Sequence, residues 1–169
     1  MHLVLHALPG CQVRSLSDVR YLVGLGNYTA GDDAVGVFVV EHVVANGLDR
    51  GFAAVDLSTN ALNLVSYLKP DTEAVLVIDA ASLDLEPGAY RFFSPDEVET
   101  RKELAGLSTH EGDVLKVLDL AASAGFPIPP LAIMGIEPCN MASGIGLSAR
   151  LAKCVPAYAA AAIERLSQL

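Results

Sequence analysis

The chain has 169 residues, of which 52% are hydrophobic and 18% are charged. A chain of this length buries about 70% of its unfolded surface, so we expect one globular domain with a sizeable core. Eleven basic residues against 20 acidic ones give a net charge of −9. That balance disfavours general binding to nucleic acid or to anionic membranes, so neither is expected as a partner.

The three cysteines, Cys11, Cys139 and Cys154, are far apart and form no C-x-x-C pair. This pattern predicts neither a disulfide framework nor a cysteine-based zinc site. No apolar run reaches the roughly 18 to 20 residues that span a bilayer, and no Lys or Arg precedes the faint lipoprotein-like sequence at 8–11. We therefore expect a cytoplasmic protein, with residues 1–20 as an amino-terminal extension and residues 21–169 as the domain. We also expect it to be a monomer.

Residues 21–41 predict a strand, a turn and a helix. Tyr21 to Leu25 is an apolar run typical of a buried parallel strand, and valines recur at helical spacing after the glycines that follow. Asp32 and Asp33 thus lie where a strand passes into a helix, the position at which open α/β sheets bind ligands. We expect Asp32 to cap the first helical turn and Asp33 to point toward the sheet end as a candidate site residue.

A dinucleotide-binding loop is the alternative for this stretch. Gly24 and Gly26 begin the pattern G-x-G-x-x-G, but Thr29 stands where the third glycine belongs. Two acids in the turn would also repel a pyrophosphate. An acid-based metal or proton site is therefore favoured over a dinucleotide cofactor.

Two later strands also end in an aspartate. Phe52–Val55 is followed by Asp56, and the Ser-Thr-Asn run at 58–60 favours a turn organised by that side chain over a role in the site. Ala74–Asp79 is an uninterrupted apolar run that ends in a carboxylate. Because a central parallel strand is covered on both faces, this charge should emerge into a cleft and meet a cation or hydrogen-bond donors. Asp79 is the second candidate site residue.

The remaining pattern completes an α/β chain. The expected elements are a helix over Leu62–Leu68, an antiparallel or edge strand over Ala89–Phe93, a polar rim segment over 94–108, a helix capped by Ser108 or Thr109, a last strand over Leu131–Ile136 and a carboxyl-terminal helix from about Leu147. His110 begins the capped helix. It is the best-placed nitrogen ligand for the two acids, since His2 and His6 belong to the extension and His42 to the first helix. Cys139 is expected to be a small buried residue.

Together these motifs resemble the hydrogenase maturation endopeptidases, which remove a carboxyl-terminal extension from the large subunit of nickel-iron hydrogenases. The resemblance covers residues 21–166. It rests on Gly24-x-Gly26-Asn27 with Asp32-Asp33-x-x-Gly36, on Val77-Ile78-Asp79-Ala80, on Ser108-Thr109-His110, and on Gly135-Ile136-x-Pro138 with Gly144-Ile145-Gly146-Leu147-Ser148. No single motif is specific, but the set is.

The resemblance implies an α/β fold, a three-layer α/β/α sandwich with a mostly parallel five-stranded sheet and helices on both faces. It also implies that Asp33, Asp79 and His110 are the catalytic and metal-binding residues, and that the partner is a hydrogenase large-subunit precursor. The implied metal is nickel, carried by the substrate or bound at the site, and zinc or cadmium could substitute. The chain departs from the family at 56–58, where Asp-Leu-Ser replaces the usual Asp-Gly-Gly and Leu57 closes the backbone approach that glycine allows.

Two mechanisms remain open at this stage. A metal held by the three side chains could polarise the scissile carbonyl and activate water. Alternatively, nickel already in the substrate is recognised, and the paired acids transfer protons. Two other functions compete with an endopeptidase: a nickel-sensing or chaperone-like module that docks on the large subunit without cutting, and an unrelated doubly wound enzyme that acts on small molecules.

Overall fold

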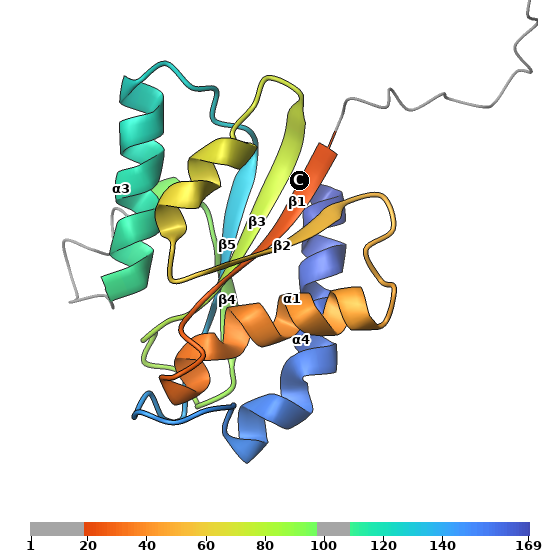
Figure 1. The fold of residues 1–169 in the computed structure, drawn as a ribbon, viewed down its shortest axis with the longest axis vertical. Coiled ribbons are helices and arrows are strands. Elements are labelled where there is room, and N and C mark those ends of the chain that lie inside the picture. The colour runs from red at the N-terminus through yellow and green to blue at the C-terminus, as the bar shows by residue number, and fades with distance from the viewer. Residues whose placement is uncertain (1–18, 98–108) are drawn as a thin grey trace, which may run out of the picture.

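The computed structural model describes residues 19–97 and 109–169. Most of the expected amino-terminal extension and most of the expected rim segment lie outside the described residues. In chain order the elements are β1 (Val19–Leu25), η1 (Gly31–Ala34), α1 (Val35–Ala45), β2 (Ala53–Ser58), η2 (Ala61–Tyr67), β3 (Thr72–Ala80), β4 (Tyr90–Phe93), α3 (Thr109–Ser123), β5 (Leu131–Ile136) and α4 (Ala149–Gln168), where η marks a 3-10 helix (Figure 1).

The strands form one sheet in the order β2-β1-β3-β5-β4. The pairs β1–β2, β1–β3 and β3–β5 are parallel, whereas β4 runs antiparallel to β5 at the edge. This confirms the expected direction of the strand that follows Ala89. A short connection after β3 cannot return the chain to the start of a parallel strand, so β4 has to run backwards.

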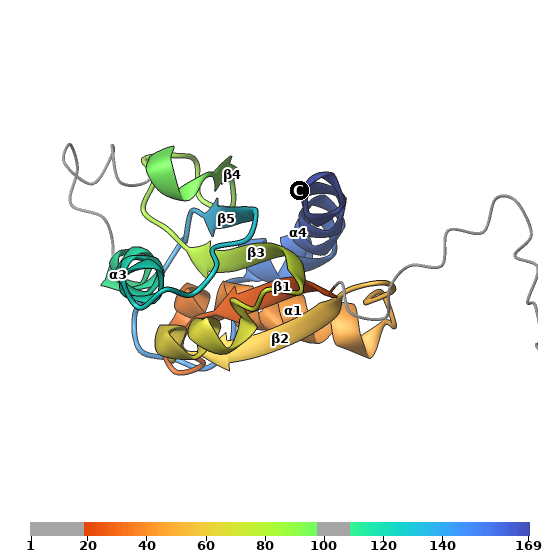
Figure 2. The same ribbon diagram turned by 90° about the horizontal axis from the view of Figure 1, so that it is seen from above.

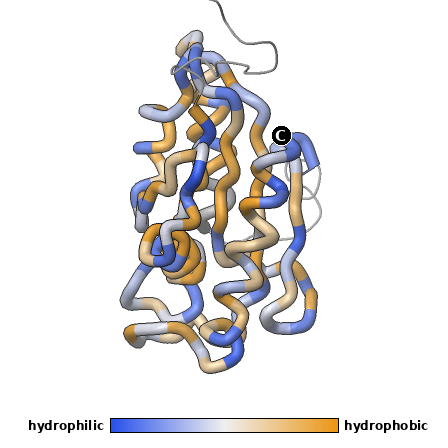
Figure 3. Tube along the Cα trace, turned by 90° about the vertical axis from the view of Figure 1, so that its right-hand side faces the viewer, coloured by the Kyte–Doolittle hydropathy of each residue, from blue (hydrophilic) through white to orange (hydrophobic). Residues whose placement is uncertain are grey.

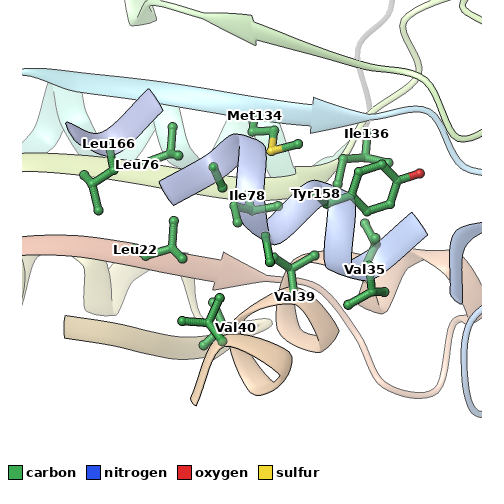
Figure 4. Close-up of a cluster of buried hydrophobic side chains, with 14 of the residues drawn as sticks. Leu22, Val35, Val39, Val40, Leu76, Ile78, Met134, Ile136, Tyr158 and Leu166 are labelled. Atoms are coloured by element: carbon green, nitrogen blue, oxygen red, sulfur yellow. The ribbon is translucent and has the colours of Figure 1, made fainter. Parts of the chain in front are cut away.

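Helices cover both faces of the sheet, and Figure 2 shows the strands edge-on between the two layers. We call the face of the sheet that α1 and α4 cover face one, and the opposite face, face two. On face one, α1 and α4 pack against β1, β3 and β5 (Figure 4). On face two, η2 and α3 pack against the opposite sides of the same strands. The sandwich expected from the sequence is therefore confirmed, and hydrophobic residues concentrate along its central strands (Figure 3).

Local sequence explains where most elements begin and end. The apolar runs of β1, β3 and β5 become central strands because helices cover both of their faces. β1 begins two residues earlier than predicted, at Val19, and Arg20 within it pairs with Glu73 at 2.6 Å. Ser148 caps α4 by accepting a hydrogen bond from the amide of Leu151. In the part of the chain that the structure describes, no helix is both long enough and apolar enough to cross a bilayer.

Candidate active site

The sheet order creates a switch point between β1 and β3. The chain leaves β1 through α1, which lies on face one. The strand β5 lies beside β3, and the helix that leads into it, α3, lies on face two. Connections that depart to opposite faces open a crevice beyond the carboxyl ends of adjacent strands, and ligands of open α/β sheets bind there. Asp33 lies in η1, after β1, and Asp79 is the next-to-last residue of β3, so both predicted acids lie at this switch point.

Close backbone approach brings the segment after β1 onto the strand ends. A Cβ atom on Gly36 would lie 2.2 Å from the carbonyl oxygen of Ile78 and 2.4 Å from that of Leu25, and one on Gly26 would lie 2.0 Å from the carbonyl oxygen of Asp33. Only glycine fits these two positions. The start of α1 therefore lies directly over the ends of β1 and β3, and η1 contacts β3.

Both acids are buried, with 2% of Asp33 and 1% of Asp79 exposed. The expectation that Asp79 emerges into an open cleft is wrong, because η1 and the neighbouring loops cover the strand ends. The Oδ1 atom of Asp79 accepts a hydrogen bond of 2.9 Å from the amide of Ala80. Because strand side chains alternate, Asp79 points to the same face as Val75 and Val77, which is face two.

His110 belongs to the first turn of α3. Its side chain lies outside the described part of the chain, so its predicted role as a ligand stays a prediction. Among the side chains that are described, no three His, Cys, Asp or Glu residues lie close enough together to bind a metal ion. The described members of the predicted set are thus the two carboxylates of Asp33 and Asp79, whose oxygens are ligands that suit a divalent cation, and an imidazole could complete the set.

Asp32 does not cap the helix that follows it, which corrects the prediction. It is fully buried, and its carboxylate accepts hydrogen bonds from the amides of Cys139, Asn140 and Ser148. No side chain caps η1 or α1 at its start. The physical reason is that α1 begins through a 3-10 turn, while the loop after β5 presents three amides that compensate the buried charge better than a single cap would.

Three other residues complete the description of the strand ends. Asp56 is exposed and accepts from the amide and hydroxyl of Ser58 at 2.6 and 2.9 Å, but β2 continues through Asp56 to Ser58, so the predicted end of the strand at Val55 is wrong. Leu57 is buried in the core of face two. Cys139 is exposed, so the expectation that it is buried is wrong; its amide donates to the buried Asp32, while its side chain is left in solvent.

Sequence reasoning assigned no role to Glu137, which follows β5. Its Oε2 atom accepts hydrogen bonds from the amides of Leu83 at 2.6 Å and Leu85 at 3.2 Å, and its backbone pairs with Gly88 and Ala89. Glu137 therefore fixes the connection that follows Asp79. An acid directly after a buried strand was the signal that could have identified it.

Tyr158 of α4 contacts the connection that follows β3, and its pKa is changed by its surroundings. The hydroxyl of Tyr158 donates a hydrogen bond of 2.7 Å to the carbonyl of Gly88. Burial, with smaller contributions from Cys154, Cys139 and Asp32, raises the pKa of Tyr158 above its ordinary value. The Tyr158 hydroxyl therefore keeps its proton, which it donates to Gly88.

A family model described as hydrogenase maturation protease matches residues 37–165. This chain belongs to that family. The chain is 30% identical to the hydrogenase expression/formation protein HupD of Bradyrhizobium diazoefficiens over 129 residues, which cover 75% of this chain and 67% of HupD. It is 28% identical to HupD of Rhizobium leguminosarum over 147 residues, 86% of this chain and 72% of that protein.

Solved structures show the same fold. The hydrogenase maturating endopeptidase HybD from Escherichia coli superposes with a TM-score of 0.73 at 19% identity, over 89% of this chain and 93% of HybD. The [NiFe] hydrogenase maturation protease HybD from Thermococcus kodakarensis gives 0.72 at 20% identity, over 88% and 99%. The predicted family and the predicted α/β/α sandwich are confirmed. As a hydrogenase maturation protease this chain is an endopeptidase, and the interpretation as an unrelated small-molecule enzyme is wrong.

Proposed function

We propose that this protease removes the carboxyl-terminal extension from the large-subunit precursor of a nickel-iron hydrogenase, in the cytoplasm and as a monomer, once nickel has been inserted. One observation carries the proposal: a hydrogenase maturation protease holds two buried carboxylates, Asp33 and Asp79, on contacting elements at the switch point of its sheet.

The nickel ion enters the proposal as part of the substrate. Two carboxylates at one sheet end repel each other when both are ionised, and a divalent cation relieves that repulsion. The Asp79 side chain points to face two, the face that α3 covers. We therefore assign His110, in the first turn of α3, as the nitrogen donor that completes the set. Zinc and cadmium accept the same donors and would compete with nickel.

The chain's own groups then account for recognition and proton transfer. Asp33 and His110 contact the nickel of the precursor and so hold the adjacent peptide bond at the sheet end. A buried carboxylate within reach of a water molecule can act as its general base, and we assign this role to Asp79. The proton taken from the attacking water passes to the leaving amine, so that one peptide bond breaks and two chain ends form.

The experiment compares three substrates for the purified protein. Nickel-loaded precursor should be shortened on a gel, metal-free precursor should be cut poorly, and a synthetic peptide spanning the cut should stay intact, because a site with so few polar groups reads a folded partner and its metal. Efficient cleavage of the peptide would indicate a protease that reads a sequence motif. Tight binding of the loaded precursor without cleavage would indicate the alternative, a nickel-sensing or chaperone-like module.

A further inference from the structure

We propose that residues 138–148, the clamp loop, form a docking contact for the folded protein substrate beside the active site. Ile145 is the contact residue, and Asp32 is the residue that holds the loop in position. This inference rests on the proposed function, because it takes the precursor as the occupant of the surface. The loop connects β5 to α4.

Asp32 fastens both ends of the clamp loop. Its Oδ2 atom accepts from the amides of Cys139 at 2.9 Å and Asn140 at 3.0 Å, and its Oδ1 atom accepts from the amide of Ser148 at 2.6 Å. Hydrogen bonds to an ionised acceptor are among the stronger ones in proteins. One fully buried carboxylate therefore closes the loop, because it binds the second and third residues and the last residue.

The middle of the clamp loop is tied to the turn that leads into η1. The amide of Asp32 donates to the carbonyl of Asn140 at 2.9 Å, the amide of Gly31 donates to Gly144 at 3.0 Å, and the amide of Gly144 donates to Thr29 at 2.9 Å. Gly31 has φ +58, and a Cβ there would lie 2.8 Å from the carbonyl oxygen of Asn140. The loop is thus ordered before any substrate arrives, which lowers the entropy lost on binding.

The ordered loop presents apolar side chains to solvent. Ile145 is 89% exposed, more than any other large apolar side chain in the described residues; Leu62 and Leu120 follow at 57%. Met141, in the same loop, is 40% exposed. No residue of the clamp loop is charged, in a chain with net charge −9. Single exposed apolar residues are common. An isoleucine held out by a fastened, uncharged loop fits an apolar, uncharged patch on a protein partner.

The position of the loop selects the occupant. Asp32 and Asp33 are adjacent in η1, so the residue that holds the clamp loop is the chain neighbour of a proposed site residue. A folded protein whose peptide reaches Asp33 therefore passes the clamp loop. This continuity with the proposed cleavage site favours the precursor over any other protein or a second copy of the chain.

The first test is Ile145→Asp, assayed with nickel-loaded precursor. Because Ile145 makes its contact outside the reacting groups, KM should rise at least tenfold with kcat within twofold of wild type. The melting temperature should not change, since the side chain is exposed. Leu62→Asp, at an exposed position of η2, is the matched control and should leave KM unchanged. An unchanged KM for Ile145→Asp, or an equal rise for Leu62→Asp, overturns the inference.

The second test couples Asp32 to Ile145. Asp32→Asn keeps the volume but weakens the grip, so KM should rise and the further effect of Ile145→Asp should shrink from tenfold to less than threefold. Independent effects that multiply would show that Asp32 only stabilises the fold, and this would remove its positioning role. If the wild-type protein does not cut the loaded precursor at all, the proposed function fails instead, and direct binding of the precursor to wild type and Ile145→Asp still decides the docking contact.

Discussion

The two faces of the sheet are covered by different kinds of structure. On face one, α1 and α4 are α-helices of 11 and 20 residues, and the start of α1 meets the strand ends backbone to backbone. On face two, η2 is a 3-10 helix of 7 residues that packs on α3, with an open groove of about 300 Å³ lined by residues of both elements.

This difference indicates that the two faces have different roles at the sheet end: face one holds the backbone in place, and face two supplies side chains. Contacts between backbone atoms leave little room for adjustment, so face one fixes the position of Asp33 and, through Asp32, the clamp loop. Face two contributes the side chain of Asp79 and the helix of His110 through side-chain packing next to an open groove. We therefore expect substitutions on face one to disturb fold and site together, and substitutions under η2 to lower stability while leaving the site in place.

The largest effect is expected from Gly36→Val, which breaks the backbone contact of face one. The new side chain would overlap the carbonyl oxygens of Ile78 and Leu25, and neither can move without disrupting the central strands. Stability should fall by at least about 4 kcal/mol, and processing should be lost with it. Urea unfolding measures the change. Gly144→Ala is the control, because the nearest atom to its Cβ would be 4.0 Å away; similar losses for both would contradict the argument.

Replacing either proposed site acid, Asp33 or Asp79, should affect activity more than stability. Asp33→Asn and Asp79→Asn keep the volume of the side chain but remove its charge. Processing of the precursor should fall at least about 100-fold, because losing a residue that only orients a metal ligand already costs up to about 100-fold. Both variants should melt close to wild type, because the lost hydrogen bonds are offset by relief of like-charge repulsion. Asp56→Asn, at an exposed position of β2, should retain activity. Unfolded site variants would instead make the two acids structural.

The sequence predicted the parts of this arrangement that depend on local pattern. The strands β3 and β5 are uninterrupted apolar runs, and the aspartate after such a run placed Asp79 at the sheet end. The role of Asp32 could not be predicted, because its partners lie 107 to 116 residues away along the chain. The type of η2 was also hidden, since one or two turns of α-helix and 3-10 helix share nearly the same spacing of apolar residues.

Face two can be tested directly with Leu64→Ala in η2. Leu64 is buried, but the groove beside η2 gives its surroundings room to collapse, so the loss should be about 2 kcal/mol, the low end for a buried leucine. Processing at 25 °C should stay within threefold of wild type. Leu22→Ala, on the central strand β1 and facing α1 and α4, is the matched variant and should cost about 4 kcal/mol. Equal costs would show that both faces are equally rigid.

The smallest effect concerns Tyr158, where α4 of face one reaches the connection after β3. Tyr158→Phe removes the hydrogen bond to Gly88 and should lower stability by about 1 kcal/mol at pH 7. Burial raises the pKa of Tyr158 in the folded state, whereas an unfolded tyrosine ionises near pH 10. The unfolded state therefore loses its proton first, and wild-type stability should fall as the pH rises above about 10.

The phenylalanine variant has no proton to lose at this position, so its alkaline decline should be shallower than that of wild type. It should not vanish, because burial and the hydrogen bond to Glu41 raise the pKa of Tyr28 as well. Urea unfolding at pH 8, 10 and 11 measures both slopes, with Tyr67→Phe, in η2 on face two, as the control. Parallel slopes for wild type and Tyr158→Phe would show that the Tyr158 hydroxyl ionises as easily in the folded protein as in water, and that the middle of α4 is open to solvent at this side chain.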